Sequence, residues 1–282
     1  MRALVTLLAA AAALVGATPA TPATPAASAA PVARAGASTR APVPCAGRHC
    51  WHPEVGDTFF WQLAGTVRAG RRATIYDIDS ETTPRATVAA LHRHKRKVVC
   101  YISGGSFEEY RGDASAFPAA VLGEQLDGWP DERWLDIRQL HILAPIMRAR
   151  MAACRAKGFD GIEFDNVDGY TQKSGFDITA ADQLRYNRWL ADEAHRHGLA
   201  AGLKNDPDQV TALVRWFDFA VVEQCFQYSE CAKYTPFIRA YKPVFDAEYV
   251  TPLRTFCVPA RRLRIEAARY PLALNGAQSR CP

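Results

Sequence analysis

Short runs of apolar and β-branched residues recur along the chain, and segments with helical periodicity separate most of them. The runs cover Thr58–Leu63, Ala73–Ile78, Val98–Ser103, Gly161–Phe164, Leu199–Lys204, Phe217–Glu223, Pro243–Tyr249 and Pro271–Leu274. Apolar residues at three- and four-residue spacing predict helices over Pro84–Arg96, Ile137–Lys157 and Ala180–His197. Eight strands that alternate with helices are typical of an α/β protein, and they predict a single (β/α)8 TIM barrel.

The N-terminal segment has a different pattern. Arg2 precedes an apolar run from Ala3 to Val15, and small residues follow it. This arrangement predicts a secretory signal peptide over residues 1–17, with cleavage possible as late as residue 20. The apolar run is too short to cross a membrane. Residues 18–44 are rich in Ala, Pro and Thr, which predicts a disordered linker. We therefore expect a secreted, extracellular protein whose folded domain, residues 45–282, is one barrel.

Eight cysteines in a secreted chain favour disulfide bonds. Two pairs would close short loops, a third would cross the last helix, and a fourth is left over: Cys225–Cys231, Cys45–Cys50, Cys257–Cys281 and Cys100–Cys154. If Tyr101 faces the barrel interior, Cys100 faces the outer helices, where Cys154 lies. Two free buried thiols are the alternative for that last pair. No cysteine–histidine spacing indicates a zinc site, and we expect neither metal nor cofactor.

The net charge of the chain is +5, and its most basic run is His92–Lys97. This run lies where a predicted helix ends, and cations are favourable at a helix C-terminus. The interleaved aromatic residues of a nucleic-acid surface are missing from it. We therefore expect no nucleic-acid or membrane partner, and we expect a monomer.

Acidic residues gather where the predicted strands end. They include Asp77 and Asp79 on the second strand, Glu163, Asp165 and Asp168 around the end of the fourth, Glu223 on the sixth, and Asp246 and Glu248 on the seventh. In an α/β barrel the carboxyl ends of the strands form the active-site face. A structural or capping role is the usual explanation for any single carboxylate. Many of them together indicate a site in which like charges raise one another's pKa, as a general acid needs.

Paired carboxylates accompanied by aromatic residues are typical of glycoside hydrolysis. The chain has no motif for a nucleophilic serine or cysteine. Its Gly-rich segment Ser103–Ser106 is too short for a phosphate loop and lacks the lysine that would follow. The sequence therefore favours a secreted glycosidase.

Several segments in order resemble glycoside hydrolase family 114. They include Trp61-Gln-Leu, Tyr76-Asp-Ile-Asp79, Cys100-Tyr-Ile-Ser-Gly-Gly-Ser106, Gly128-Trp-Pro, Trp134-Leu-Asp-Ile-Arg138, Gly158-Phe-Asp-Gly161, Asp165-Asn-Val-Asp-Gly-Tyr170, Gly202-Leu-Lys-Asn-Asp206, Glu223-Gln-Cys-Phe226 and Glu248-Tyr249. The resemblance spans roughly Trp51 to Cys281. It implies a TIM-barrel endo-α-1,4-polygalactosaminidase that cuts galactosamine-rich exopolysaccharide, with Asp165 and Glu223 as the catalytic carboxylates.

Other residues at the strand ends are expected to bind the substrate: Asp77, Asp79, Tyr101, Glu163, Asn166, Asp168, Lys204, Glu248 and Tyr249. Partly deacetylated polygalactosamine carries ammonium groups, and an enclosed acidic mouth would attract this cationic or amino-sugar polysaccharide. Lys204 is expected to pair with a neighbouring carboxylate and to lower its pKa.

There are two competing interpretations, and the sequence argues against both. One is a chitinase-like barrel of glycoside hydrolase family 18, because Phe159–Asp165 echoes the strand-four motif of that family. The motif places its catalytic glutamate where this chain has Val167, which cannot protonate a leaving group. The other is a non-catalytic secreted barrel that binds polysaccharide or cell wall, against which the presence of both Asp165 and Glu223 argues.

Overall fold

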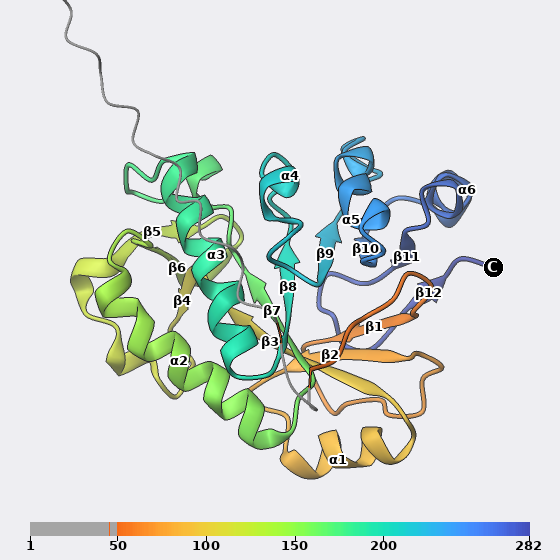
Figure 1. Ribbon diagram of the computed structural model, residues 1–282, viewed down its shortest axis with the longest axis horizontal. Coiled ribbons are helices and arrows are strands. Elements are labelled where there is room, and N and C mark those ends of the chain that lie inside the picture. The colour runs from red at the N-terminus through yellow and green to blue at the C-terminus, as the bar shows by residue number, and fades with distance from the viewer. Residues whose placement is uncertain (1–44, 46–49) are drawn as a thin grey trace, which may run out of the picture. The chain divides into compact units, whose positions relative to one another are not determined.

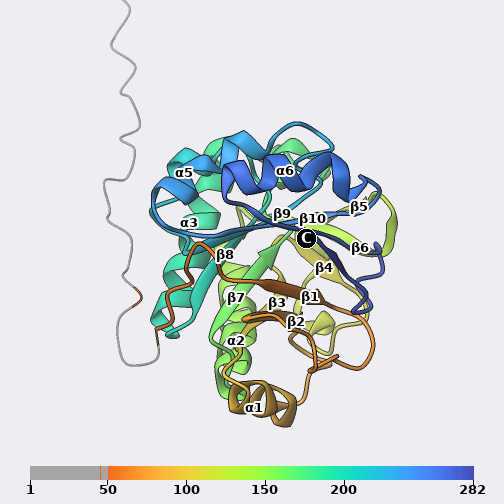
Figure 2. The same ribbon diagram turned by 90° about the vertical axis from the view of Figure 1, so that its right-hand side faces the viewer.

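The computed structural model describes Cys45 and residues 50–282, so the predicted signal peptide and linker lie outside the described residues. Nine strands in this part form one curled sheet in the order β1-β2-β3-β7-β8-β9-β10-β11-β12 (Figures 1 and 2). They are β1 (Phe59–Gln62), β2 (Ile75–Asp79), β3 (Lys97–Ser103), β7 (Gly161–Asp165), β8 (Ala200–Lys204), β9 (Phe219–Glu223), β10 (Val244–Glu248), β11 (Glu266–Arg269) and β12 (Ser279–Arg280). Neighbours from β1 to β11 are parallel, and β12 is antiparallel to β11.

Seven of the eight strands expected from the sequence overlap strands of this sheet, but the eighth expectation was wrong. The last parallel strand is β11, and Pro271–Leu274 follows it as a turn. Pro271 has no N–H for a ladder, which disfavours a strand beginning there. The turn nevertheless helps to close the barrel, because the backbone oxygen of Leu274 accepts hydrogen bonds from Leu63 N (2.9 Å) and Ala64 N (3.2 Å), just after β1.

The three predicted helices are confirmed; two of their six ends fall at the expected residue, and the other four are one to three residues shorter. The α-helices are α1 (Arg85–Arg93), α2 (Leu140–Lys157), α3 (Ala180–Arg196), α4 (Val210–Leu213), α5 (Thr235–Arg239) and α6 (Leu253–Leu263), and short 3₁₀ turns lie at Ala114–Ala116, Ala119–Val121, Gly169–Thr171 and Cys231–Tyr234. Thr179 caps α3 in a reciprocal capping box with Asp182. In Figure 1 the first three helices cover the outer side of the sheet beside β2, β3 and β7.

Two apolar cores follow from the alternation of side chains along each strand. One fills the barrel interior and contains Phe59, Trp61, Val99, Phe219 and Phe245. Residues of β1 and β10 meet there, since the rings of Phe59 and Phe245 stack at 4.5 Å. The other lies between the strands and the helices. Every second residue of a strand therefore points into the barrel interior, and the last inward-pointing residue of each strand lies at the mouth of the barrel.

All four expected disulfides are confirmed. The sulfur–sulfur distances are 2.04 Å for Cys45–Cys50, 1.97 Å for Cys100–Cys154, 1.96 Å for Cys225–Cys231 and 2.01 Å for Cys257–Cys281. Cys225 and Cys231 also lie near the Asp246 carboxylate, but their sulfurs are bonded to each other and are not available to a metal ion. None of the described helices is long and apolar enough to cross a membrane.

A small antiparallel sheet between β3 and α2 was not expected from the sequence. It contains β4 (Ser106–Glu108), β5 (Leu122–Leu126) and β6 (Trp129–Leu135), in the order β4-β6-β5. Asp127 and Gly128 form its two-residue hairpin turn, a pattern that favours a β-hairpin. Because β4 begins three residues after β3 ends, this sheet stands beside the mouth of the barrel (Figure 1).

Candidate active site

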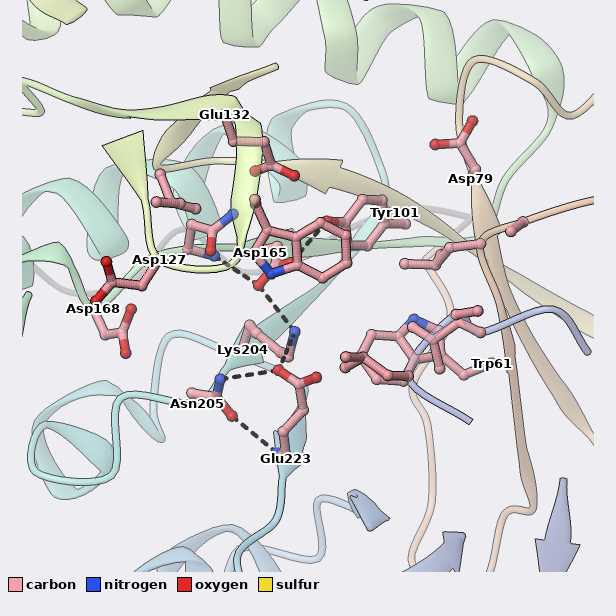
Figure 3. Close-up of a pocket in the computed structure, with 18 of the residues that line it drawn as sticks. Trp61, Asp79, Tyr101, Asp127, Glu132, Asp165, Asp168, Lys204, Asn205 and Glu223 are labelled. Atoms are coloured by element: carbon pink, nitrogen blue, oxygen red, sulfur yellow. Dashed lines mark hydrogen bonds and ion pairs between the residues drawn. The ribbon is translucent and has the colours of Figure 1, made fainter. Parts of the chain in front are cut away.

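A cavity of about 770 Å³ opens at the carboxyl ends of the parallel strands. Its wall includes Tyr101 from β3, Asp165 from β7, Lys204 from β8 and Glu223 from β9, together with Trp61, Asp79, Asp127, Trp129, Glu132, Asn166, Asp168, Asn205 and Tyr249. Figure 3 shows how these side chains converge from separate strands. The convergence is what the sequence predicted for a barrel of this kind.

Lys204 lies at the centre of the site and is buried. Its ammonium nitrogen is 2.9 Å from Asp165 Oδ1 and 2.9 Å from Glu223 Oε2. The same nitrogen lies 4.7 Å from the centre of the Trp61 ring, which adds a cation–π contact. Burial alone would lower the pKa of Lys204, but the charges of Asp165, Glu223 and Glu163 raise it well above its ordinary value. Lys204 is therefore a permanent cation between two carboxylates.

Asp165 accepts hydrogen bonds from three directions. Lys204 donates to Oδ1, the hydroxyl of Tyr101 donates to Oδ2 at 2.7 Å, and the backbone N–H of Asn166 donates to Oδ1 at 2.8 Å. Burial raises the pKa of Asp165, but the Lys204 charge and these hydrogen bonds outweigh it, so the pKa is lowered below its usual range. This confirms the expected effect of Lys204, and it makes Asp165 an ionised group at neutral pH.

Glu223 faces Asp165 across the lysine. The hydroxyl of Tyr249 donates to its Oε1, and Lys204 lies next to its Oε2. Asn205 fixes the end of β9, because its Oδ1 accepts the backbone N–H of Glu223 at 3.0 Å. Four side chains from the ends of the neighbouring strands β7, β8 and β9 therefore hold one another in place: Asp165, Lys204, Asn205 and Glu223 (Figure 3).

The chain turns sharply after each of the three central residues. Asn166 (φ 60°), Asn205 (φ 50°) and Gln224 (φ 56°) follow Asp165, Lys204 and Glu223 in the left-handed region. Non-glycine residues rarely adopt this conformation, although Asn does so more readily than most, and it is enriched at functional sites. The turn after β7 is also tight against Gly105, where a Cβ atom would lie 1.7 Å from the backbone oxygen of Asn166.

Two of the expected substrate-binding carboxylates lie one layer below the cavity. Asp77 and Glu163 point into the barrel interior, where each is 0% exposed, and neither lines the cavity. Glu163 and Asp165 are two residues apart and therefore share one face of β7, but two residues along a strand span about 6.6 Å, which places the two carboxyl groups in different layers. Burial raises the pKa of Asp77 to about 7 and raises that of Glu163 well above its usual range.

Glu248 points away from the cavity altogether, so the structure corrects its expected contact with substrate. Tyr249 lines the cavity, and adjacent strand residues face opposite sides. Glu248 Oε1 instead accepts the backbone N–H groups of Phe226 (2.8 Å) and Gln227 (3.2 Å). It holds the loop that follows Glu223, and it is fully buried.

Asp79 reaches the cavity wall but is already paired. Its Oδ2 lies 2.6 Å from Arg111, which also bonds to Glu108 at 2.7 Å. Its Oδ1 accepts the backbone N–H and the hydroxyl of Thr82. Asp79 therefore joins β2 to the small antiparallel sheet.

The sequence analysis did not identify Glu132, on β6. Glu132 lines the cavity, and Ser106 donates to its Oε2 at 2.8 Å. Asn166 donates in turn to Ser106 at 3.0 Å, which connects this glutamate with the residue beside Asp165. Burial raises the pKa of Glu132 to about 7. The sequence held no clear signal for it, because Asp131, Glu132 and Arg133 are three charged residues in a row and show no apolar–polar alternation of a strand with one face toward the site.

Asp168 follows β7 in the loop and lies on the same side of the cavity as Glu132 and Asp127 (Figure 3). Burial, followed by the charge of Asp165, raises the pKa of Asp168 to about 6. Its one side-chain partner at hydrogen-bonding distance is Gln172 Nε2, at 3.3 Å. Neither Asp168 nor Glu132 forms an ion pair with any residue that the structure describes.

The model of glycoside-hydrolase family GH114 matches residues 40–281. The chain belongs to glycoside-hydrolase family GH114. This finding confirms the family expected from the sequence, makes the protein a glycosidase, and removes the chitinase-like alternative. The chitinase-like interpretation needs a glutamate at the position of Val167, and Val167 is fully buried.

Solved structures agree with this membership. The crystal structure of Ega3 from Aspergillus fumigatus in complex with galactosamine is 36% identical, with a TM-score of 0.79, over 82% of this chain and 97% of that chain. The glycoside hydrolase domain of PelA from Pseudomonas aeruginosa is 16% identical, with a TM-score of 0.60, over 79% of this chain and 97% of that chain, and supports the fold. No curated protein matches the chain.

Proposed function

We propose that this protein is a secreted, endo-acting hydrolase of α-1,4-linked, galactosamine-rich exopolysaccharide, and that Asp165 and Glu223 are its catalytic pair. The observation that carries the proposal is the Lys204 ammonium, 2.9 Å from each of the two carboxylates at the wall of the cavity. The similarity to Ega3, which was crystallised with galactosamine, supports the substrate class. Four disulfides support an oxidising, extracellular location.

The spacing of the two carboxylates favours a retaining mechanism. Because Asp165 Oδ1 and Glu223 Oε2 each lie 2.9 Å from the same nitrogen, these oxygens are no more than twice that distance, 5.8 Å, apart. Retaining glycosidases have carboxyl groups roughly 5–5.5 Å apart, and inverting enzymes need roughly 6.5–9.5 Å to admit a water molecule between them.

Hydrogen bonding and exposure support a different role for each carboxylate. Asp165 is the nucleophile, because its donors keep it ionised. Glu223 is the acid/base, because its side chain is the more exposed of the two, 25% against 17%, and is better placed to exchange protons with water. Asp165 attacks the anomeric carbon while Glu223 protonates the departing oxygen. A water molecule then loses its proton to Glu223 and breaks the glycosyl–Asp165 bond.

Asp168 and Glu132 are suited to the amino groups of the substrate. Asp165 and Glu223 already have a cation beside them in Lys204, and Asp79 has one in Arg111. Asp168 and Glu132 have no such partner among the described residues, so an ammonium group of the sugar would supply the missing cation. Tyr101, Asn166 and Tyr249 also line the cavity and complete the proposed substrate contacts.

The proposal is tested by incubating the purified protein with polygalactosamine and measuring new reducing ends. The expected result is a rapid fall in chain length, with products first released as the α anomer, which proton NMR distinguishes from the β anomer. Binding of the polysaccharide without release of reducing ends would instead support the non-catalytic interpretation. Products that first appear as the β anomer would contradict the retaining mechanism.

A further inference from the structure

Asp77 and Glu163 are two buried acids to which the proposed mechanism gives no role. Each is 0% exposed, and none of their four carboxyl oxygens accepts a hydrogen bond from any N–H or O–H group that the structure describes. The two carboxyl groups lie within hydrogen-bonding reach of each other. A proton on one of them is therefore the hydrogen-bond donor that the pair can supply for itself.

Two ionised carboxylates cannot share such a place. Each would be desolvated and would face a like charge, and both effects favour the protonated form. Full protonation is opposed by a nearby cation, since Lys204 Nζ lies 3.7 Å from Glu163 Oε1. Together these effects favour a pair that holds one proton and one negative charge, as in other coupled carboxyl pairs.

The surroundings of the pair leave few other charges to balance it. Lys204 on β8 and Asp165 on β7 are the charged groups that act on both acids. The neighbouring strands contribute Trp61, beside Asp77 in the register of β1 with β2, and Tyr101 on β3, beside Glu163. The single negative charge thus lies directly beneath the lysine that joins the catalytic carboxylates.

We propose that Asp77 and Glu163 are a positioning pair, which shares one proton and keeps one negative charge beneath Lys204 so that the lysine does not over-stabilise the ionised forms of Asp165 and Glu223. The proposal rests on the proposed function of those two residues. Asp77 and Glu163 act through Lys204 and do not contact the substrate, as their position below the cavity requires.

Neutralising the pair has a predictable direction. The pair loses its negative charge only when both acids are replaced, because in a single amide variant the remaining carboxyl group no longer faces a like charge and stays ionised. In the double variant Asp77→Asn/Glu163→Gln the negative charge beneath Lys204 is lost, so the lysine attracts the catalytic carboxylates more strongly. Both would then ionise at lower pH, and both limbs of the pH profile of kcat would move down together, by about 1 pH unit. A purely structural role would lower kcat or the melting temperature without moving the limbs.

The experiment compares the pH profiles of kcat and KM for wild type, the single variant Glu163→Gln, the double variant Asp77→Asn/Glu163→Gln and the control Asp246→Asn. Asp246 is also a buried carboxyl group with a pKa raised by burial, but it lies on the outer face of β10 and accepts the Cys225 N–H. We expect the acid shift in the double variant, and unshifted profiles in the single variant and in the control. A folded double variant with the wild-type profile, or a single variant that shifts as far as the double variant, would overturn the proposal.

A second measurement needs neither a variant nor a substrate. The carboxyl ¹³C shifts of Asp77 and Glu163 in the labelled wild-type protein should report one shared proton at pH 6. Two fully ionised or two fully protonated groups at that pH would overturn the proposal. If polygalactosamine is not cleaved at all, the proposed function fails, while this measurement still decides the state of the pair.

Discussion

Replacing Lys204 by methionine removes the cation that holds the site together. The substitution keeps the length and apolar character of the side chain, but it leaves Asp165 and Glu223 facing each other without the charge that lies 2.9 Å from both. Removing one member of a buried ion pair costs about 3–5 kcal/mol. We expect a loss of about that size, ~3–5 kcal/mol, in the free energy of unfolding at pH 7.

The sign of the pH dependence follows from Asp165. Its folded pKa is lowered, so its ionised form stabilises the folded protein above the unfolded pKa of about 3.9, and this stability is lost as the pH falls through the folded value. The difference between wild type and Lys204→Met should therefore be largest near pH 7 and should shrink below about pH 4.

Urea unfolding at pH 7 and at pH 3.5, with the disulfides intact, measures both quantities. Lys242→Met is the matched control, because Lys242 is partly buried and donates to the backbone oxygens of Val214 (2.7 Å) and Phe217, which do not titrate. Its cost should be similar at the two pH values. A Lys204→Met protein as stable as wild type at pH 7, or one whose loss is the same at both pH values, would refute the reasoning.

Four further outcomes are expected. Asp165→Asn and Glu223→Gln should each fold normally and lower turnover on polygalactosamine oligomers by about 100-fold or more, because each removes nucleophilic or acid–base help; near-wild-type turnover in either would contradict the assignment. Asp168→Asn should raise KM for the cationic polymer more than it lowers kcat, and adding salt should narrow the gap from wild type; an unchanged KM would argue against an amine contact. The double variant Cys225→Ser/Cys231→Ser should lose more turnover than Cys257→Ser/Cys281→Ser at equal melting-temperature loss, because its loop begins two residues after Glu223; equal losses would count against this. A protein that starts just before Cys45 should keep the melting temperature and activity of the longer chain, since residues 18–44 show no core-forming pattern; a large drop in either would disprove this expectation.

The sequence was sufficient for the barrel because periodicity and strand-end chemistry agree along most of its length. Apolar runs and helical segments alternate in the chain as they do in the structure, and the acidic residues follow the strands. The antiparallel sheet was missed because β5 and β6 lie in a segment rich in polar residues, with a bulged register. Its stability depends on packing beside the mouth, which local pattern does not report.

The site was harder to predict, because the sequence at a strand end does not reveal which way each side chain points or how deep it lies in the barrel. Adjacent residues Glu248 and Tyr249 were both assigned to the substrate, although alternation allows one of them at most to face the cavity. Depth was the second difficulty, since Glu163 and Asp165 share a face but lie in different layers. The cysteine pairs were easier, because two of the four close loops of five and six residues.

The distribution of charge explains why a basic chain can present an acidic cavity. The net charge is +5, but the two buried cations of the cavity wall are already paired, since Lys204 lies between Asp165 and Glu223, and Arg111 lies between Asp79 and Glu108. The third cation of the wall, Lys173, is exposed to solvent. Carboxylates therefore outnumber cations around the cavity. Burial holds the pKa of Asp168 and Glu132 near neutrality, at about 6 and about 7, so a bound ammonium group would complete their ionisation. The selectivity for an amino sugar would then come from the acids that the protein leaves without a cation, while the two acids that carry the chemistry are held by Lys204.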